Sequence, residues 1–211
     1  MLIISATGGS GSTFVSSRFK KAGWSVCLRP DVGSQKGFVL DYFKKRTAKF
    51  FKSSPDIYDD RELFELVYRH LKLDKKTRKN KTMLMLMVWG GLGFLKDLPD
   101  KKIYIVRSPI FTYNSYIKPQ HLERLGAKSK DDPKAVDAFF GWYSHWVEHY
   151  KNALEDKDGY VVRYENFKKD WEKIPDVPPI HKDFVCKNDI SKLTLKQDTI
   201  DYIFKKVESC T

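Results

Sequence analysis

Residues 2–14 read Leu-Ile-Ile-Ser-Ala-Thr-Gly-Gly-Ser-Gly-Ser-Thr-Phe, a short apolar run followed by a turn of glycines and hydroxyl residues. An apolar run of this length is typical of a strand that is buried on both faces of a parallel sheet. The next residues, from Phe14 to Ala22, have a helical pattern that Gly23 ends. We therefore predict a strand, a glycine-rich turn and a helix, an arrangement that presents backbone N–H groups to an anion.

Strand and helix patterns alternate along the rest of the chain. We predict further strands at residues 24–28, 83–88, 103–106 and 160–163, and helices at 35–73, 135–154 and 195–207. This alternation indicates an α/β fold with three αβα layers and a central, mostly parallel sheet. Because no repeat, low-complexity segment or linker divides the chain, we expect residues 1–211 to form a single domain.

The chain is basic, with 39 Lys and Arg against 27 Asp and Glu and a formal net charge of +12. This balance predicts an anionic partner without saying which kind. The three cysteines form no CxxC pair, which argues against a zinc ribbon and against a disulfide-stapled secreted scaffold. No apolar stretch approaches the ~20 residues of a membrane-spanning helix, and the apolar start lacks a basic leader, so we expect a cytoplasmic protein.

The first turn is richer in glycine and hydroxyl residues than a helix cap requires. Residues 7–13 hold three glycines together with Ser10, Ser12 and Thr13, which favours anion binding over a plain strand–helix turn. Neither the GxxxxGK[ST] pattern of nucleotide kinases nor the GxGxxG pattern of dinucleotide-binding proteins is present. We therefore expect a phosphate loop that lacks the lysine of NTPases.

A second candidate anchor lies at the end of the strand 103–106. Arg107 follows this strand directly, and Ser115 comes eight residues later, beyond Pro109, which suits the first turn of a helix. The two side chains can converge on one phosphate, the arginine through charge-assisted hydrogen bonds and the serine through its hydroxyl. The alternative is a surface arginine paired with a carboxylate, with Ser115 as an ordinary helix residue.

Together, these stretches resemble the sulfotransferases that use 3′-phosphoadenosine 5′-phosphosulfate (PAPS). The family pattern [KR]-S-G-[ST]-[ST]-[WFL] is matched from Ser10 to Phe14, and R-x-P-x(5)-S is matched by Arg107, Pro109 and Ser115. A strand ending in Arg-Tyr-Glu is matched at residues 163–165. The resemblance implies a P-loop-like sulfotransferase fold. It also implies transfer of a sulfonate group from PAPS to a hydroxyl or amine, with 3′-phosphoadenosine 5′-phosphate (PAP) as product and no metal.

The resemblance also implies roles for individual residues. The first loop would hold the 5′-phosphosulfate, Phe14 would stack on adenine, and Tyr164 would reach the adenine edge. Arg107 and Ser115 would bind the 3′-phosphate. The implied cofactor-binding residues are Gly8, Gly9, Ser10, Gly11, Ser12, Thr13, Phe14, Arg107, Ser115 and Tyr164.

The candidate catalytic residues are Asp31 and Ser10. Some family members place a general base just beyond the second strand, after Arg-Pro, and Arg29-Pro30-Asp31 matches that context. The alternative for Asp31 is a simple turn aspartate after proline.

The chain departs from the family just before Ser10, where a Lys or Arg normally polarises the bridging oxygen and Gly9 stands here. Loss of a positioned cation slows such a reaction by orders of magnitude unless another cation, such as Arg18, Lys20 or Arg29, replaces it. The family's common histidine near the third strand is also absent. Two alternatives therefore stay open: a catalytically weak or inactive PAP- or nucleotide-binding protein of the same fold, and a nucleotide kinase-like phosphotransferase.

Two further patterns in the sequence resemble functional sites. His145 to His149 form HxxEH, an inverted zinc-peptidase motif, but Trp142, Trp146 and Tyr150 form a core-facing stripe that predicts both histidines on the less buried side. The basic runs at 44–46 and 75–79 are compatible with nucleic-acid binding, but lysine runs mostly cover solvated faces. We expect a small-molecule or glycan acceptor, with an anionic acceptor as one option, and neither nucleic acid nor a membrane as partner.

Overall fold

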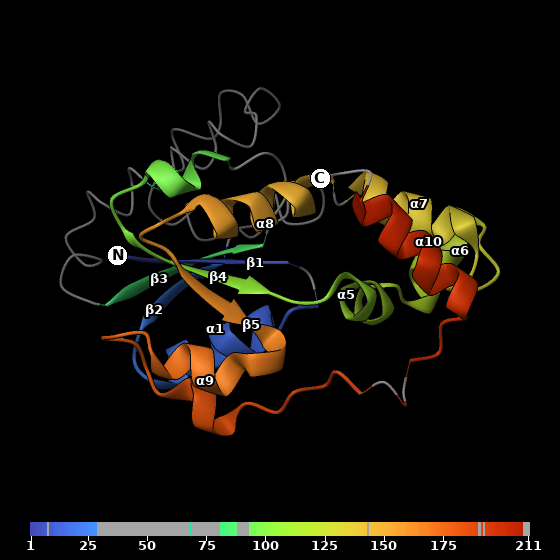
Figure 1. The fold of residues 1–211 in the computed structure, drawn as a ribbon. Coiled ribbons are helices and arrows are strands. Elements are labelled where there is room, and N and C mark those ends of the chain that lie inside the picture. The colour runs from blue at the N-terminus through green and yellow to red at the C-terminus, as the bar shows by residue number, and fades with distance from the viewer. Residues whose placement is uncertain are drawn as a thin grey trace, which may run out of the picture.

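The five strands that the structure describes form one all-parallel sheet in the order β2-β3-β1-β4-β5 (Figure 1). They are β1 (Leu2–Ala6), β2 (Ser25–Leu28), β3 (Thr82–Met87), β4 (Lys101–Val106) and β5 (Tyr160–Arg163). The structure is a computed structural model and describes residues 1–7, 9–28, 68, 81–87, 93–142, 144–189, 191 and 193–208. The predicted parallel sheet is confirmed.

The central strand is β1, which pairs with β3 on one side and β4 on the other. All five of its residues are buried, as its continuous apolar run predicts. Ala6 is aligned with Ile105, so β1 and β4 end at the same edge of the sheet. The turn after β1 and the residue after β4 therefore leave the sheet side by side, where ligands of parallel α/β sheets commonly bind.

Helices cover both faces of the sheet and extend beyond its carboxyl edge (Figure 1). On one face lie α1 (Ser12–Lys21) and α9 (Phe167–Glu172), and on the other lies α8 (Ser144–Glu155). These layers confirm the predicted three-layer α/β class. The remaining elements are η1 (Gly93–Asp97), α5 (Pro109–Tyr116), α6 (Pro119–Leu125), α7 (Pro133–Trp142), η2 (Tyr164–Asn166), η3 (Ile180–Asp183) and α10 (Gln197–Glu208).

Two apolar clusters hold these layers together. On the face of the sheet that α1 and α9 cover, Phe19 of α1 lies 6.0 Å from Trp171 of α9, measured between ring centres. Both side chains are buried. Beyond the carboxyl edge, Tyr113, Phe139 and Ile203 join α5, α7 and α10. No helix in the described part of the chain is long and apolar enough to cross a bilayer.

The helix predicted at 135–154 corresponds to α7 and α8, which lie on either side of residue 143, a position outside the described residues. Helix α7 packs on α6 and α10, and α8 packs on β4 and η1. Strand β4 begins two residues before the predicted start, because Lys102 reads as polar in the sequence but is buried. Apart from Tyr68, the predicted helical stretch 35–73 lies outside the described residues.

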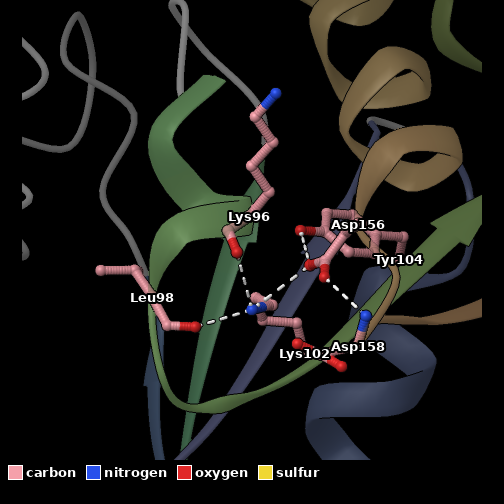
Figure 2. A network of polar contacts seen from close by, with 6 residues as sticks. All are labelled: Lys96, Leu98, Lys102, Tyr104, Asp156 and Asp158. Atoms are coloured by element: carbon pink, nitrogen blue, oxygen red, sulfur yellow. Dashed lines mark hydrogen bonds and ion pairs between the residues drawn. The ribbon is translucent and has the colours of Figure 1, made fainter.

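A buried ion pair fixes the amino end of β4 to the turn that follows α8 (Figure 2). Lys102 Nζ lies 3.4 Å from Asp156 Oδ2, with the two side chains 4% and 3% exposed. Lys102 Nζ also donates hydrogen bonds to the carbonyls of Leu98 at 2.7 Å and Lys96 at 3.1 Å. Tyr104 donates its hydroxyl hydrogen to Asp156 at 2.7 Å. Since water does not reach the pair, each charge depends on the other.

We predict that Asp156→Asn lowers the free energy of unfolding by about 3 kcal/mol, because it leaves the Lys102 ammonium buried without a counter-charge. Asparagine keeps an acceptor for Tyr104 but not for the backbone N–H of Asp158, which Asp156 Oδ1 accepts at 3.1 Å, so the charge is isolated by comparison with a double variant that carries the same asparagine. The double variant Lys102→Met/Asp156→Asn removes both charges and is expected to recover most of the loss. Urea denaturation of the three proteins measures this, and equal losses in the single and double variants would contradict it.

Candidate functional site

The turn between β1 and α1 is bent by two glycines with left-handed backbone. Gly9 has φ 79° and Gly11 has φ 89°. Between them, Ser10 is fully buried, and its backbone N–H and its hydroxyl both donate to the carbonyl of Thr7, at 3.2 and 2.6 Å. A Cβ atom at Gly11 would lie 3.3 Å from the ring of Tyr164. The turn is thus a tight one in which the backbone angle favours glycine at residue 11 and the ring of Tyr164 leaves little room for a side chain.

The amino end of α1 is open to an anion. Gly11 caps the helix without a side-chain hydrogen bond, and the first intrahelical bond runs from the N–H of Val15 to the carbonyl of Gly11 at 3.0 Å. The N–H groups of the preceding helical residues, 12–14, have no acceptor within the helix, and the helix dipole makes this end positive. The hydroxyl of Thr7 is buried, and among the residues that the structure describes it has no hydrogen-bond partner.

Arg107 ties this turn to two other parts of the chain. Its Nη1 donates to the carbonyl of Gly9 and to the hydroxyl of Ser115, the latter at 2.8 Å. Its Nε donates to Asn188 Oδ1 at 2.8 Å. The guanidinium carbon lies 4.3 Å from the centre of the Tyr164 ring, a cation–π distance. The two motif regions that the sequence placed apart, the first loop and the Arg107–Ser115 pair, therefore meet at one point.

The charge of Arg107 is buried among neutral acceptors. The residue is 4% exposed, and within the described residues its side chain donates to neutral oxygen atoms and forms no ion pair with a carboxylate. Loss of solvation lowers the pKa of Arg107 from its usual value, while Tyr164 and Glu165 act in the opposite direction. An arginine remains protonated under these conditions. A desolvated cation without a direct counter-ion favours the approach of an anion.

The two aromatic candidates lie beside the loop in a cluster of rings. Tyr164 is 4% exposed and lies 5.0 Å from Phe184, ring centre to ring centre. Phe14 is half-buried and lies 5.4 Å from Phe184 and 6.1 Å from Phe167. In this arrangement the ring of Tyr164 lies against the guanidinium group of Arg107 and packs against Gly11 of the turn. The contacts with adenine that the resemblance implies for Tyr164 and Phe14 stay predictions.

The structure brings most of the sequence-predicted site residues to one end of the sheet. These are Gly9, Ser10, Gly11, Ser12, Thr13, Phe14, Arg107, Ser115 and Tyr164. Gly8 and Asp31 lie outside the described residues, as does Arg29. Ser10 uses its hydroxyl hydrogen within the turn. Of the substitute cations, Arg18 is paired with Asp183 at 3.3 Å.

One residue of the site was not found from the sequence. Asn188 contacts Arg107 directly, yet it lies in a segment without secondary structure. Such a segment has no hydrophobic periodicity, so neither spacing nor pattern singles out an asparagine within it.

The comparisons with known proteins give structural matches only. A sulfotransferase domain from the curacin biosynthetic pathway matches with a TM-score of 0.47 and 17% sequence identity, covering 85% of this chain and 76% of that one. TT1252 from Thermus thermophilus matches with a TM-score of 0.39 and 10% identity, covering 77% of this chain and 86% of that one. No protein-family model and no curated protein matches the chain. At these TM-scores and identities we assign neither a family nor a function from the matches.

His149, the last residue of the HxxEH pattern, is buried against the sheet, so its predicted place on the less buried side was wrong. It is 1% exposed, and its Nε2 lies 3.1 Å from the carbonyl of Ile105. A carbonyl only accepts, so Nε2 carries the hydrogen and Nδ1 accepts from the Ser5 hydroxyl at 3.0 Å. Both ring nitrogens are thus used by β1 and β4. Among the described residues, no three His, Cys, Asp or Glu side chains are grouped to hold a metal ion.

We predict that His149 makes the fold less stable as the pH falls. Burial lowers the pKa of His149 from 6.5 to about 4. Between these two values the unfolded chain binds the proton and the folded chain does not. The free energy of unfolding should therefore fall by up to about 1.4 kcal/mol for each pH unit below 6.5. Urea denaturation from pH 7 to pH 4 measures the slope. The difference between the wild type and His149→Gln, which cannot titrate, isolates this residue, and parallel pH profiles would contradict the prediction.

Proposed function

We propose that this chain is a sulfotransferase that moves a sulfonate group from PAPS to a hydroxyl or amine of an acceptor. The observation that carries the proposal is the contact of Arg107 with both Gly9 and Ser115. This contact joins two motifs whose residues lie 98 positions apart in the sequence. Gly9 directly precedes the matched stretch Ser10 to Phe14, and Arg107 and Ser115 belong to the second matched pattern. In the resembling family these two patterns bind the two phosphate ends of PAPS.

The donors at this site suit the anionic groups of such a nucleotide, which supports the proposal. The open N–H groups at the start of α1 would bind and orient the 5′-phosphosulfate. Arg107 and Ser115 would hold the 3′-phosphate. Ser115 accepts from Arg107 through a lone pair, which leaves its own hydrogen to donate to a ligand. The buried hydroxyl of Thr7, for which the described part of the chain offers no hydrogen-bond partner, lies in the same loop.

PAPS supplies an activated sulfonate, whose bond to the phosphate oxygen breaks as an acceptor oxygen or nitrogen attacks the sulfur and PAP departs. The chain's part in this proposal is to hold the phosphosulfate and to remove the acceptor's proton. Asp31 remains the candidate general base that accepts this proton. Since Gly9 stands where the family has a cation, the charge on the departing oxygen would be met by backbone N–H groups and by a cation from elsewhere in the chain.

A second candidate function is that of a PAP-binding protein with little or no turnover. It is favoured by the lack of a cationic side chain at position 9, where the chain has glycine. Its carbonyl oxygen, rather than a cationic side chain, faces Arg107 at this position. Such a protein would bind PAP through the same contacts. Transfer of radiolabelled sulfonate from PAPS to a panel of alcohols, glycans and amines separates the two candidates. Binding of PAP without transfer to any of them would favour the second.

We predict that PAP raises the melting temperature of the protein through Arg107. At a concentration of about 100 times its Kd, PAP should add about 2.7 kcal/mol of stability, which corresponds to a shift of several degrees for a chain of this size. Arg107→Ala should abolish the shift, because it removes the buried cation. Ser115→Ala keeps Arg107 and should reduce the shift.

The matched control is Arg124→Ala, which removes an exposed arginine from α6 and should leave the shift unchanged. Circular dichroism of each variant without ligand checks that it folds. Failure of PAP to shift the wild type at millimolar concentration would overturn the proposed function.

A further inference from the structure

A chain of hydrogen bonds leads from Arg107 to the surface. Arg107 Nε donates to Asn188 Oδ1 at 2.8 Å, and Asn188 Nδ2 donates to Glu165 Oε1 at 2.5 Å. The same carboxylate oxygen accepts the backbone N–H of Ser108 at 3.1 Å. Arg107 is buried, Asn188 is half-buried and Glu165 is exposed. A neutral amide thus lies between a buried cation and a solvated carboxylate.

The segment that carries Asn188 is packed onto the site. Phe184 is buried, and its ring stacks on Phe167 at 4.1 Å between ring centres and meets Tyr164 at 5.0 Å. The packing of Phe184 places the segment four residues before Asn188, so the amide of Asn188 is held in place by its own segment as well as by Glu165.

The bonds of Arg107 fix the plane of its guanidinium group. Nη1 is directed to Gly9 and Ser115 on one side, and Nε is directed to Asn188 on the other. Because the group is planar, these two directions fix where Nη2 points. Within the described residues, the N–H groups of Nη2 are the donors left for an anion.

We propose that Asn188, itself held by Glu165, is a positioning residue that orients Arg107 toward an anionic ligand while leaving its charge unneutralised. This inference rests on the proposed function and adds to it. A carboxylate placed directly on Nε would form an ion pair with Arg107, and a bound phosphate would then share the cation with it. An amide gives the same direction without the charge. Glu165, being exposed, is screened by water and salt.

The test measures the affinity of PAP for variants of the two residues by isothermal titration calorimetry. Asn188→Ala loses the hydrogen bond to the guanidinium and should weaken PAP binding about tenfold. Asn188→Asp keeps an acceptor for Nε, adds a negative charge beside Arg107 and loses the donor to Glu165, so it should weaken binding about 100-fold. Glu165→Gln keeps the acceptor oxygen for Asn188 and Ser108 and should bind within about twofold of the wild type.

A spectroscopic readout separates orientation from general loss of structure. The Nε–H signal of Arg107 in nitrogen-edited NMR spectra should shift in Asn188→Ala without ligand and stay close to the wild-type position in Glu165→Gln. The matched control is Asn166→Ala, which removes an exposed asparagine from η2 that makes no side-chain cap. Its affinity and its Arg107 signal should match those of the wild type. Thermal unfolding of each variant checks folding.

The outcomes distinguish the two levels of the proposal. If the wild type binds PAP and Asn188→Asp binds it equally well, the positioning role is overturned and the proposed function stands. Equal losses in Asn188→Ala and Asn188→Asp would overturn the argument about charge. If the wild type does not bind PAP, the proposed function and this inference fall together.

Discussion

The hydrogen bonds of the Arg107 guanidinium group hold together the carboxyl end of the sheet. The group connects the turn after β1, the helix α5 and the segment after η3 through hydrogen bonds to Gly9, Ser115 and Asn188. Because the group is buried, each of these acceptors replaces water that the cation has lost. The ring of Tyr164 covers one face of the cation and also packs against Gly11. The shape of the loop and the orientation of the cation are therefore set together.

The parallel sheet makes this meeting possible. Since Ala6 is aligned with Ile105, the chain leaves β1 and β4 at neighbouring points of the carboxyl edge. At the opposite end of β4, Lys102 is tied to Asp156 beyond α8 (Figure 2). On the face covered by α8, His149 bonds to both strands through Ser5 and Ile105. Polar contacts thus fix β4 at both ends and along its length. The backbone position from which the Arg107 side chain extends is therefore rigid.

The parts of the fold that the sequence predicts well are those with a strong local pattern. Residues 2–14 combine a continuous apolar run with several glycines, and both the strand and the turn follow from them. The predicted start of β4 is two residues late, because the sequence does not show that Lys102 is buried and paired with Asp156. The prediction for His149 was wrong because the aromatic stripe indicates only one buried side of the helix. The stripe does not show that a histidine on another side can form hydrogen bonds to the sheet through both ring nitrogens. Asn188 depends on a tertiary contact without any local pattern.

We propose that Arg107 and Ser115 bind the 3′-phosphate of the nucleotide. This binding is tested most directly by comparing the affinities of PAP and adenosine 5′-monophosphate, which lacks that phosphate, in the wild type and in Arg107→Ala. Charge-assisted hydrogen bonds of this kind predict that the wild type binds PAP about 30-fold more tightly and that the difference disappears in the variant. Equal affinities of the wild type for the two nucleotides would contradict the claim.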